Sequence, residues 1–183
     1  TGTLPSKINI FAFKTDYTHP LKDILKMEAG VKSSYASTDN LVEYYNTIEE
    51  VTSMDYDKSN HFQYDEYINA AYVNFSKEFK RVGIQAGLRA EHTHSQGNQL
   101  GNLIKPVSRF VRDYLNLFPT FYSSLKLDSA ANNNLVFSYG RRLDRPYYED
   151  LNPFLKPLDK FTFYTGNPYL KPTFSNNLSL TYS

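Results

Sequence analysis

RVGIQAGLRAE, Arg81 to Glu91, is the stretch that decides the fold. Its even positions are apolar: Val82, Ile84, Ala86, Leu88 and Ala90. Its odd positions are charged, polar or glycine: Arg81, Gly83, Gln85, Gly87, Arg89 and Glu91. Alternation with a period of two residues predicts a β-strand that has one apolar face and one polar face.

The same alternation recurs along the chain. It is clear in residues 26–36, 134–143 and 173–183, and less regular in Lys7–Tyr17, Phe62–Lys77 and Leu117–Leu127. Together with Arg81–Glu91 these segments predict an all-β chain of about seven antiparallel strands. The 183 residues suit a single domain, which we take as 1–183.

The predicted connections alternate in length. Residues 18–24, 76–79 and 128–133 form short turns, whereas 38–61, 95–116 and 144–172 form long loops rich in polar and aromatic residues. This pattern predicts an up-and-down meander with all its long loops on one side. Outer-membrane barrels have that asymmetry, with short periplasmic turns and long external loops.

Composition excludes several classes of protein. The charge is balanced, with 20 basic and 19 acidic residues, so no basic field indicates a nucleic-acid partner. The absence of cysteine excludes disulfides and thiolate metal sites. No stretch approaches the roughly 18 apolar residues of a membrane helix. The first residues lack the features of a signal peptide, so none is expected within the chain.

Alternation alone leaves two architectures open. A soluble β-sandwich, such as a carbohydrate-binding or lectin-like module, turns its apolar face inward, whereas a membrane barrel turns it to lipid. A mean hydropathy of −0.54 excludes a helical membrane protein but not a barrel. Tyrosine at strand ends, small residues on the apolar face and the loop asymmetry favour part of a transmembrane β-barrel.

The longest predicted loop holds the candidate ligand-binding residues. It is stiffened by five prolines and carries many aromatic side chains, which stack on sugars or chelates. The candidates are Arg145, Tyr147, Tyr148, Phe163, Tyr164 and Tyr169. The alternative interpretation is a loop that packs against itself, and the two interpretations are compatible.

Other chemistry has weaker support. His92 and His94 have a spacing that can bind a metal, but surface-loop histidines at the end of a strand are the better interpretation. No nucleophile motif or paired carboxylates are found, so neither an enzyme nor a cofactor is expected. The remaining charged residues on the polar faces have two interpretations: cross-strand ion pairs on a hydrated lumen wall, or a row of charges that steers solute or holds the plug. These residues are Glu28, Lys32, Arg81, Arg89, Glu91 and Arg142.

Several motifs then carry a resemblance to a known family. They are the GLRAE strand, Arg141-Arg142 followed by Arg145-Pro146, LNPF at 151–154 and GNPYLKP at 166–172. With these motifs the chain resembles the outer-membrane β-barrels of TonB-dependent receptors of the Bacteroidetes type, over nearly its whole length. Thr173 departs from the pattern, because an acidic residue usually follows Lys-Pro in the family.

The resemblance implies a location and partners. Such receptors lie in the bacterial outer membrane, have a plug inside a barrel of about 22 strands, and take up nutrients with energy delivered through TonB. The chain would then be about a third of the wall, without the plug or signal peptide. Its implied partners are outer-membrane lipid, the plug and TonB system, and an unknown small nutrient.

Seven strands leave two unpaired sheet edges. Such edges attract other strands. We therefore expect the isolated chain either to pair its edges with a second copy, by self-association, or to curl so that one apolar face becomes a core.

Overall fold

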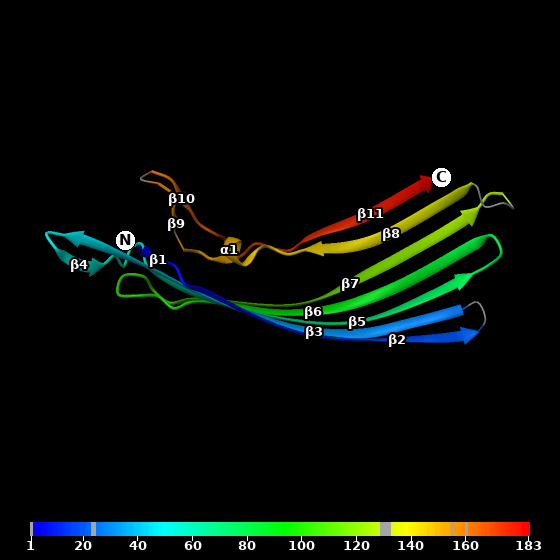
Figure 1. Cartoon of the computed structure of the whole chain (residues 1–183), viewed down its shortest axis with the longest axis horizontal. Helices are drawn as coiled ribbons and strands as arrows, with labels where there is room; N and C mark the ends of the chain where they lie inside the picture. Colours follow the sequence, from blue (N-terminus) through cyan, green and yellow to red (C-terminus); the bar gives the residue numbers. More distant parts are fainter. Residues whose placement is uncertain (1, 23–24, 129–132, 155, 160) are drawn as a thin grey trace.

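A computed structural model describes residues 2–22, 25–128, 133–154, 156–159 and 161–183. Seven long strands follow each other in one antiparallel sheet (Figure 1). They are β2 (Ser6–Lys22), β3 (Leu25–Ile48), β5 (Asn60–Glu78), β6 (Val82–Gln99), β7 (Ser108–Lys126), β8 (Asn134–Asp144) and β11 (Thr173–Tyr182). The predicted seven-strand meander is confirmed. Two of the predicted short turns include residues 23–24 and 129–132, which lie outside the described ranges.

Five short elements complete the described chain. β1 (Gly2–Thr3) and β4 (Val51–Met54) both pair with β3. The segment between β8 and β11 holds α1 (Tyr148–Leu151) and a small hairpin of β9 (Lys156–Pro157) and β10 (Phe163–Tyr164). The longest predicted loop therefore has local structure of its own.

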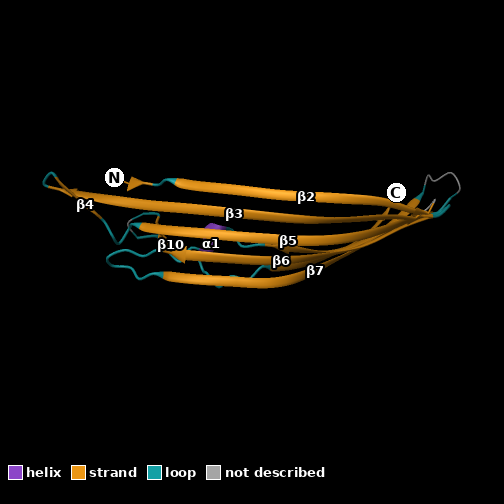
Figure 2. Cartoon of the chain, turned by 90° about the horizontal axis from the view of Figure 1, so that it is seen from below, coloured by secondary structure: helices purple, strands orange, loops and turns teal. Residues whose placement is uncertain are grey.

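The sheet is a single curved layer. Figure 2 shows β2, β3, β5, β6 and β7 side by side, and Figure 1 shows the sheet bending so that β8 and β11 rise on the side where α1 lies. The sheet does not close, and β2 and β11 are its two edges among the described residues. Because a sandwich needs two packed sheets, the alternative of a soluble β-sandwich does not describe this chain.

The apolar face of the sheet is exposed and the polar face is the more buried one. On β6, Leu88 is 45% exposed whereas Glu91 is 6% exposed. The expectation that the chain curls to make its apolar face a core is therefore wrong. An apolar face on the outside and a polar face on the concave side are what a barrel wall requires, because lipid contacts the outside and water fills the lumen.

An aromatic row crosses the outer face. Phe11, Tyr35, Tyr67 and His94 occupy matching positions on β2, β3, β5 and β6. Their ring centroids are 6.4, 4.5 and 6.3 Å apart in that order. Barrels carry such rows at the membrane boundary. Counting about 11 residues up β6 from Val82 reaches His92, so the row lies at the outer edge of the membrane.

Two of the predicted long loops are mostly strand. β3 continues to Ile48, β5 begins at Asn60, β6 continues to Gln99 and β7 begins at Ser108. The predictions of loops at 38–61 and 95–116 were therefore wrong. Above the membrane both faces of a strand contact water, so the apolar alternation disappears although the backbone ladder continues. Only 144–172 remains long.

The wall divides between β7 and β8. β6 and β7 pair along their whole lengths, but β7 and β8 pair only as far as Thr120 and Gly140. The next residue of β7 is Pro119, which has no backbone N–H to donate to a ladder. Above this point β8 and the segment after it diverge from β7, and a recess forms on the concave side.

Gly30 allows a side chain to cross a strand. Its neighbours in register are Asp16 on β2 and Tyr72 on β5. The Tyr72 hydroxyl donates a 2.5 Å hydrogen bond to Asp16 Oδ1, so the ring spans the position of Gly30. A Cβ at Gly30 would lie 2.6 Å from the Tyr72 ring and 2.8 Å from the carbonyl oxygen of Thr15.

We predict that Gly30→Ala destabilises the sheet by about 1–3 kcal/mol, because the added methyl group overpacks against a ring and a backbone oxygen. Urea titration of the protein in detergent micelles would measure the change. Gly140→Ala is the matched control, since the nearest atom to its Cβ is 3.9 Å away. Equal stability of the two variants would contradict the prediction.

Single cysteines can map the wall, because the chain has none of its own. We predict that a membrane-impermeant maleimide labels Thr52→Cys on β4 in intact cells and labels Lys80→Cys, in a short turn, only after permeabilisation. Ala86→Cys, on the lipid-facing side, should react only in detergent. Labelling of Lys80→Cys in intact cells would reverse the assigned orientation.

Candidate ligand site on the inner face

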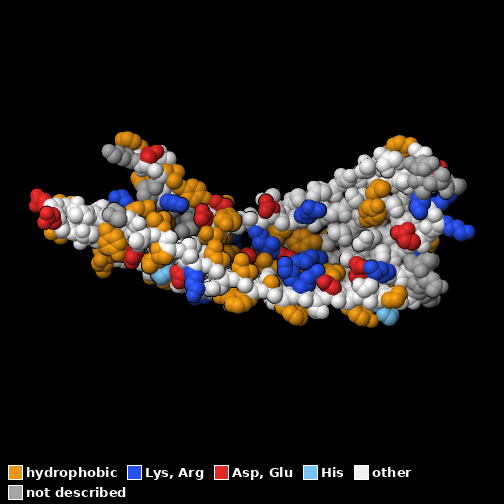
Figure 3. Space-filling model, viewed as in Figure 1, with side chains coloured by type: hydrophobic (Ala, Val, Ile, Leu, Met, Phe, Trp, Pro, Cys, Tyr) orange, Lys and Arg blue, Asp and Glu red, His pale blue; other side chains and the backbone are white. Residues whose placement is uncertain are grey.

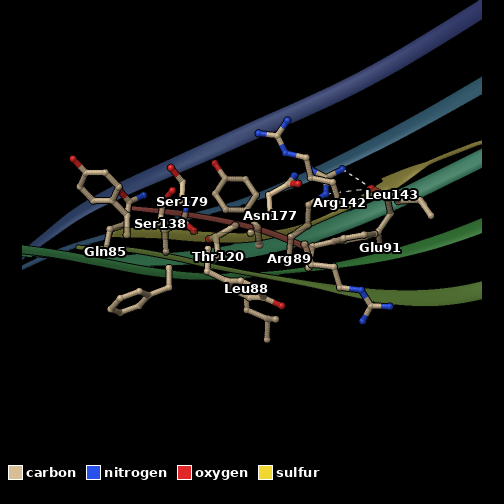
Figure 4. Close-up of a pocket in the computed structure, with 18 of the residues that line it drawn as sticks. Gln85, Leu88, Arg89, Glu91, Thr120, Ser138, Arg142, Leu143, Asn177 and Ser179 are labelled. Atoms are coloured by element: carbon tan, nitrogen blue, oxygen red, sulfur yellow. Dashed lines mark hydrogen bonds and ion pairs between the residues drawn. The ribbon is translucent and has the colours of Figure 1, made fainter. Parts of the chain in front are cut away.

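A recess of about 740 Å³ lies on the concave face, over β6, β7, β8 and β11 (Figure 4). Its volume is in the range of small-molecule sites. Charged residues line one part of it: Arg89, Glu91, Arg141, Arg142 and Arg145. Neutral hydrogen-bonding groups and aromatic rings line the rest, among them Gln85, Thr120, Ser138, Asn177, Ser179, Tyr72, Phe118 and Tyr122.

Glu91 is the centre of the charged part. It lies two residues after Arg89, so both side chains share the inner face of β6. Arg89 donates from Nε at 3.2 Å and from Nη2 at 2.8 Å to Glu91 Oε2. Arg145 donates to the other oxygen, Oε1, and to Thr93 Oγ1 at 3.3 Å. Because Glu91 is buried, both cations are needed to compensate for its lost hydration.

The other two arginines come from β8. The Arg141 guanidinium lies 4.5 Å from the centre of the Phe174 ring, in a cation–π contact. Arg142 has no hydrogen-bond or ion-pair partner among the described residues. Figure 3 shows Lys and Arg side chains gathered in this hollow. The Arg141 side chain shares the outer face with Phe174, so on the inner face three guanidinium groups stand against one carboxylate, an excess of two positive charges.

The segment 144–172 folds inward and packs on the upper wall. Leu151 is 1% exposed and forms a small core with Phe62 and Tyr64 of β5, against which Phe110 and Tyr148 also pack. Phe154 is buried nearby, with Lys105 Nζ 4.2 Å from the centre of its ring. The apolar residues of the LNPF motif therefore anchor the segment to the sheet.

Main-chain and side-chain hydrogen bonds hold residues 166–168, where the segment leads back to the sheet. The amide of Gly166 donates to the carbonyl of Asn152 at 2.9 Å, and that of Asn167 donates to the carbonyl of Asp150 at 2.6 Å. Arg112 of β7 donates to the carbonyl of Pro168. GNPYLKP is thus tied both to the LNPF region and to the wall before it enters β11.

A second, smaller pocket of about 230 Å³ lies between this segment and β3. Tyr148 and Tyr164 both line it. The Tyr164 hydroxyl donates to Asp150 Oδ1 at 2.5 Å, and this hydrogen bond raises the pKa of Tyr164 above its usual value. Burial raises the pKa of the Tyr148 phenol. Both phenols are therefore neutral hydrogen-bonding groups at physiological pH.

The six predicted ligand residues separate into three groups. Arg145 faces Glu91 in the larger recess, and Tyr148 and Tyr164 line the smaller pocket. Tyr147, Phe163 and Tyr169 are exposed. The structure does not bring all six into one surface. The segment does not pack only on itself, because Leu151 is buried against Phe62 and Tyr64 of the wall.

The two histidines lie within strand β6 rather than in a surface loop. His92 Nε2 and His94 Nδ1 each lie 3.0 Å from an oxygen of Asp113 on β7. The hydrogen bonds with His94 and His92 lower the pKa of the Asp113 carboxyl. In the part of the chain that the structure describes, no group of three or more suitable side chains could hold a metal ion.

The alternation along each strand predicted which charged residues face inward, but it did not predict that residues from different strands lie together. Arg89, Glu91 and Arg142 stood out as polar positions of separate strands. Asn177, Ser179 and Phe118 were missed as lining residues. The signal that could have found them is register: once β7, β8 and β11 are aligned, Thr120, Gly140 and Asn177 fall in one row.

The neighbours of Thr173 explain why this chain has no acidic residue after Lys-Pro. It lies opposite Asp144 in the ladder between β8 and β11. Two carboxylates at opposite positions would repel each other. A neutral threonine avoids that repulsion in this chain.

The sequence model of the outer membrane protein beta-barrel family matches residues 1–183. The chain belongs to this family. Its place is therefore the bacterial outer membrane, as predicted. No curated protein sequence matches the chain significantly. Its assignment to the Bacteroidetes type stays a prediction. Among the described residues, no helix is sufficiently long and apolar to cross a membrane.

Solved structures show the same fold. The chain is similar to the copper transporter OprC, with a TM-score of 0.66 and 13% identity over 98% of this chain and 28% of that one. It is similar to the ferric yersiniabactin uptake receptor FyuA from Yersinia pestis, with a TM-score of 0.62 and 13% identity over 99% and 26%. The siderophore receptor PiuA from Acinetobacter baumannii gives 0.58 and 12% over 76% and 24%. The chain thus spans about a quarter of the length of each of these proteins.

We predict that Leu151→Ala releases the segment from the wall, because truncating a buried leucine costs about 2–5 kcal/mol. Limited proteolysis of the protein in detergent should then cleave within 144–172 while the strands stay intact. Leu158→Ala is the matched control, since Leu158 is 63% exposed in the same segment. Similar cleavage rates in both variants would contradict the docking role of Leu151.

Proposed function

We propose that the chain is the wall and external-loop portion of a TonB-dependent outer-membrane receptor for nutrient uptake. The observation that carries the proposal is the inward-folded segment 144–172, held on the polar face by Leu151 and by the ion pair of Arg145 with Glu91. An external segment docked over a recess suits capture of a solute better than free passage. The family and the similar receptors and transporters support this function.

The proposed receptor has further parts and partners. The chain spans only about a quarter of the similar structures, so the plug and the contact with TonB would lie elsewhere in the protein. The lipid-facing surface would contact outer-membrane lipid, and the recess would face the plug and the incoming nutrient. The exposed edges β2 and β11 would pair with further strands of the barrel. Self-association through these edges stays a prediction.

We propose no catalytic role for this chain. The proteins of similar structure are transport receptors rather than enzymes. The carboxylate at the centre of the recess, Glu91, is bound by two arginines. Each of its two oxygens accepts a hydrogen bond from one of those arginines, which gives the carboxylate a structural role.

Energy-dependent uptake tests the proposal. Cells that produce the protein would be given three labelled solutes: a ferric siderophore, cobalamin and a pectic oligosaccharide. We expect uptake of one of them to stop when an uncoupler dissipates the proton gradient, while binding at the cell surface persists. A strain without the protein is the control. Uptake that continues with the uncoupler would identify a passive pore instead.

A further inference from the structure

The charge and lining of the larger recess define a ligand class. We infer that it binds an acidic sugar, with a carboxylate at its arginine part and hydroxyl groups along its neutral part. This inference rests on the proposed function and specifies the solute of the same site. Tyr147, Phe163 and Tyr169 do not line this recess and are exposed elsewhere on the surface.

The excess of positive charge is the first argument. Glu91 is already shared by Arg89 and Arg145, so it has little capacity left for a further cation. Arg142 lines the recess without a partner in the described chain. A guanidinium group prefers a planar anion that accepts two parallel hydrogen bonds, and a carboxylate has that geometry. The lining therefore selects against cations and favours a carboxylate.

The neutral part of the recess is the second argument. Thr120, Ser138 and Ser179 supply hydroxyl groups, and Gln85 and Asn177 supply amides. Figure 4 shows these five side chains following one another along the recess, with Arg142 and Glu91 beyond them. Hydroxyls and amides both donate and accept, as sugar hydroxyls do. Such a row matches a polyhydroxylated ligand better than an inorganic anion.

Aromatic rings complete the match. Tyr72, Phe118 and Tyr122 line the recess beside the polar row. The apolar face of a sugar ring packs on such aromatic surfaces. A volume of about 740 Å³ accommodates more than one sugar ring. An acidic disaccharide therefore has a partner in this recess for its charge, its hydroxyls and its apolar ring faces.

Titration calorimetry on the detergent-purified outer-membrane protein tests the inference with two matched sugars. The first is α-1,4-digalacturonate and the second is α-1,4-galactobiose, which differ only in their carboxylates. We expect digalacturonate to bind at least about tenfold more tightly, which corresponds to one charge-assisted hydrogen-bonded contact. Binding should weaken as salt is added, because the attraction is electrostatic.

Arg142→Gln should weaken digalacturonate binding about tenfold or more and bring its affinity close to that of galactobiose. Arg109→Gln is the matched control: it removes the same charge from the outer face, where Arg109 donates to Gln96, and should leave affinity within about twofold. Neither variant breaks the Glu91 ion pairs.

Three results would overturn the inference: no digalacturonate binding at millimolar concentration, equal binding of the two sugars, or equal losses in Arg142→Gln and Arg109→Gln. An acidic protein segment that fills the recess would give the first result. Energy-dependent uptake of another solute alongside any of these results would leave the receptor function standing. A passive pore in the uptake assay would reject the receptor function whatever the sugars do.

Discussion

The rest of the structure depends on the backbone ladder between neighbouring strands. A strand that crosses lipid has no water for its N–H and C=O groups, so each must find a partner on the next strand. The five long strands from β2 to β7 meet this requirement with antiparallel pairing along their lengths. The ladder also continues above the membrane. Two segments that were expected to be loops are therefore mostly strands, and they extend the wall into the solvent.

The site arises where that ladder stops. Beside Pro119 the pairing of β7 with β8 ends, and the segment that follows β8 is free to turn inward. Its apolar anchor, Leu151, is covered by the upper wall, and Arg145 reaches the buried Glu91 on β6. One interruption in the sheet thus connects the recess, its arginines and the docked segment. If β7 and β8 were paired along their whole lengths, the recess could not form in this part of the wall.

The inner and outer faces use their residues differently. Outside, the rings of Tyr35 and Tyr67 stack in a row at the membrane edge, and the Tyr35 hydroxyl donates a hydrogen bond to Asp65. Inside, Tyr72 crosses Gly30 to reach Asp16, and Arg89 and Arg145 compensate Glu91. The part of the outer face that contacts lipid therefore needs only apolar character, whereas the inner face and the upper wall carry specific polar contacts. Substitutions are accordingly expected to be more costly on the inner face.

Sequence by itself determined the strands, their two faces, the meander and the family resemblance, because side-chain alternation is a local consequence of strand geometry. It failed for strands above the membrane, where both faces are polar and Asp39 or Gln96 gives no alternating signal. Only the tertiary structure decided that the apolar face lies outside, that Leu151 docks on Phe62, and that Arg142 stands without a partner. Those facts depend on register and on the return path of 144–172, which join residues far apart in the chain and leave no local pattern.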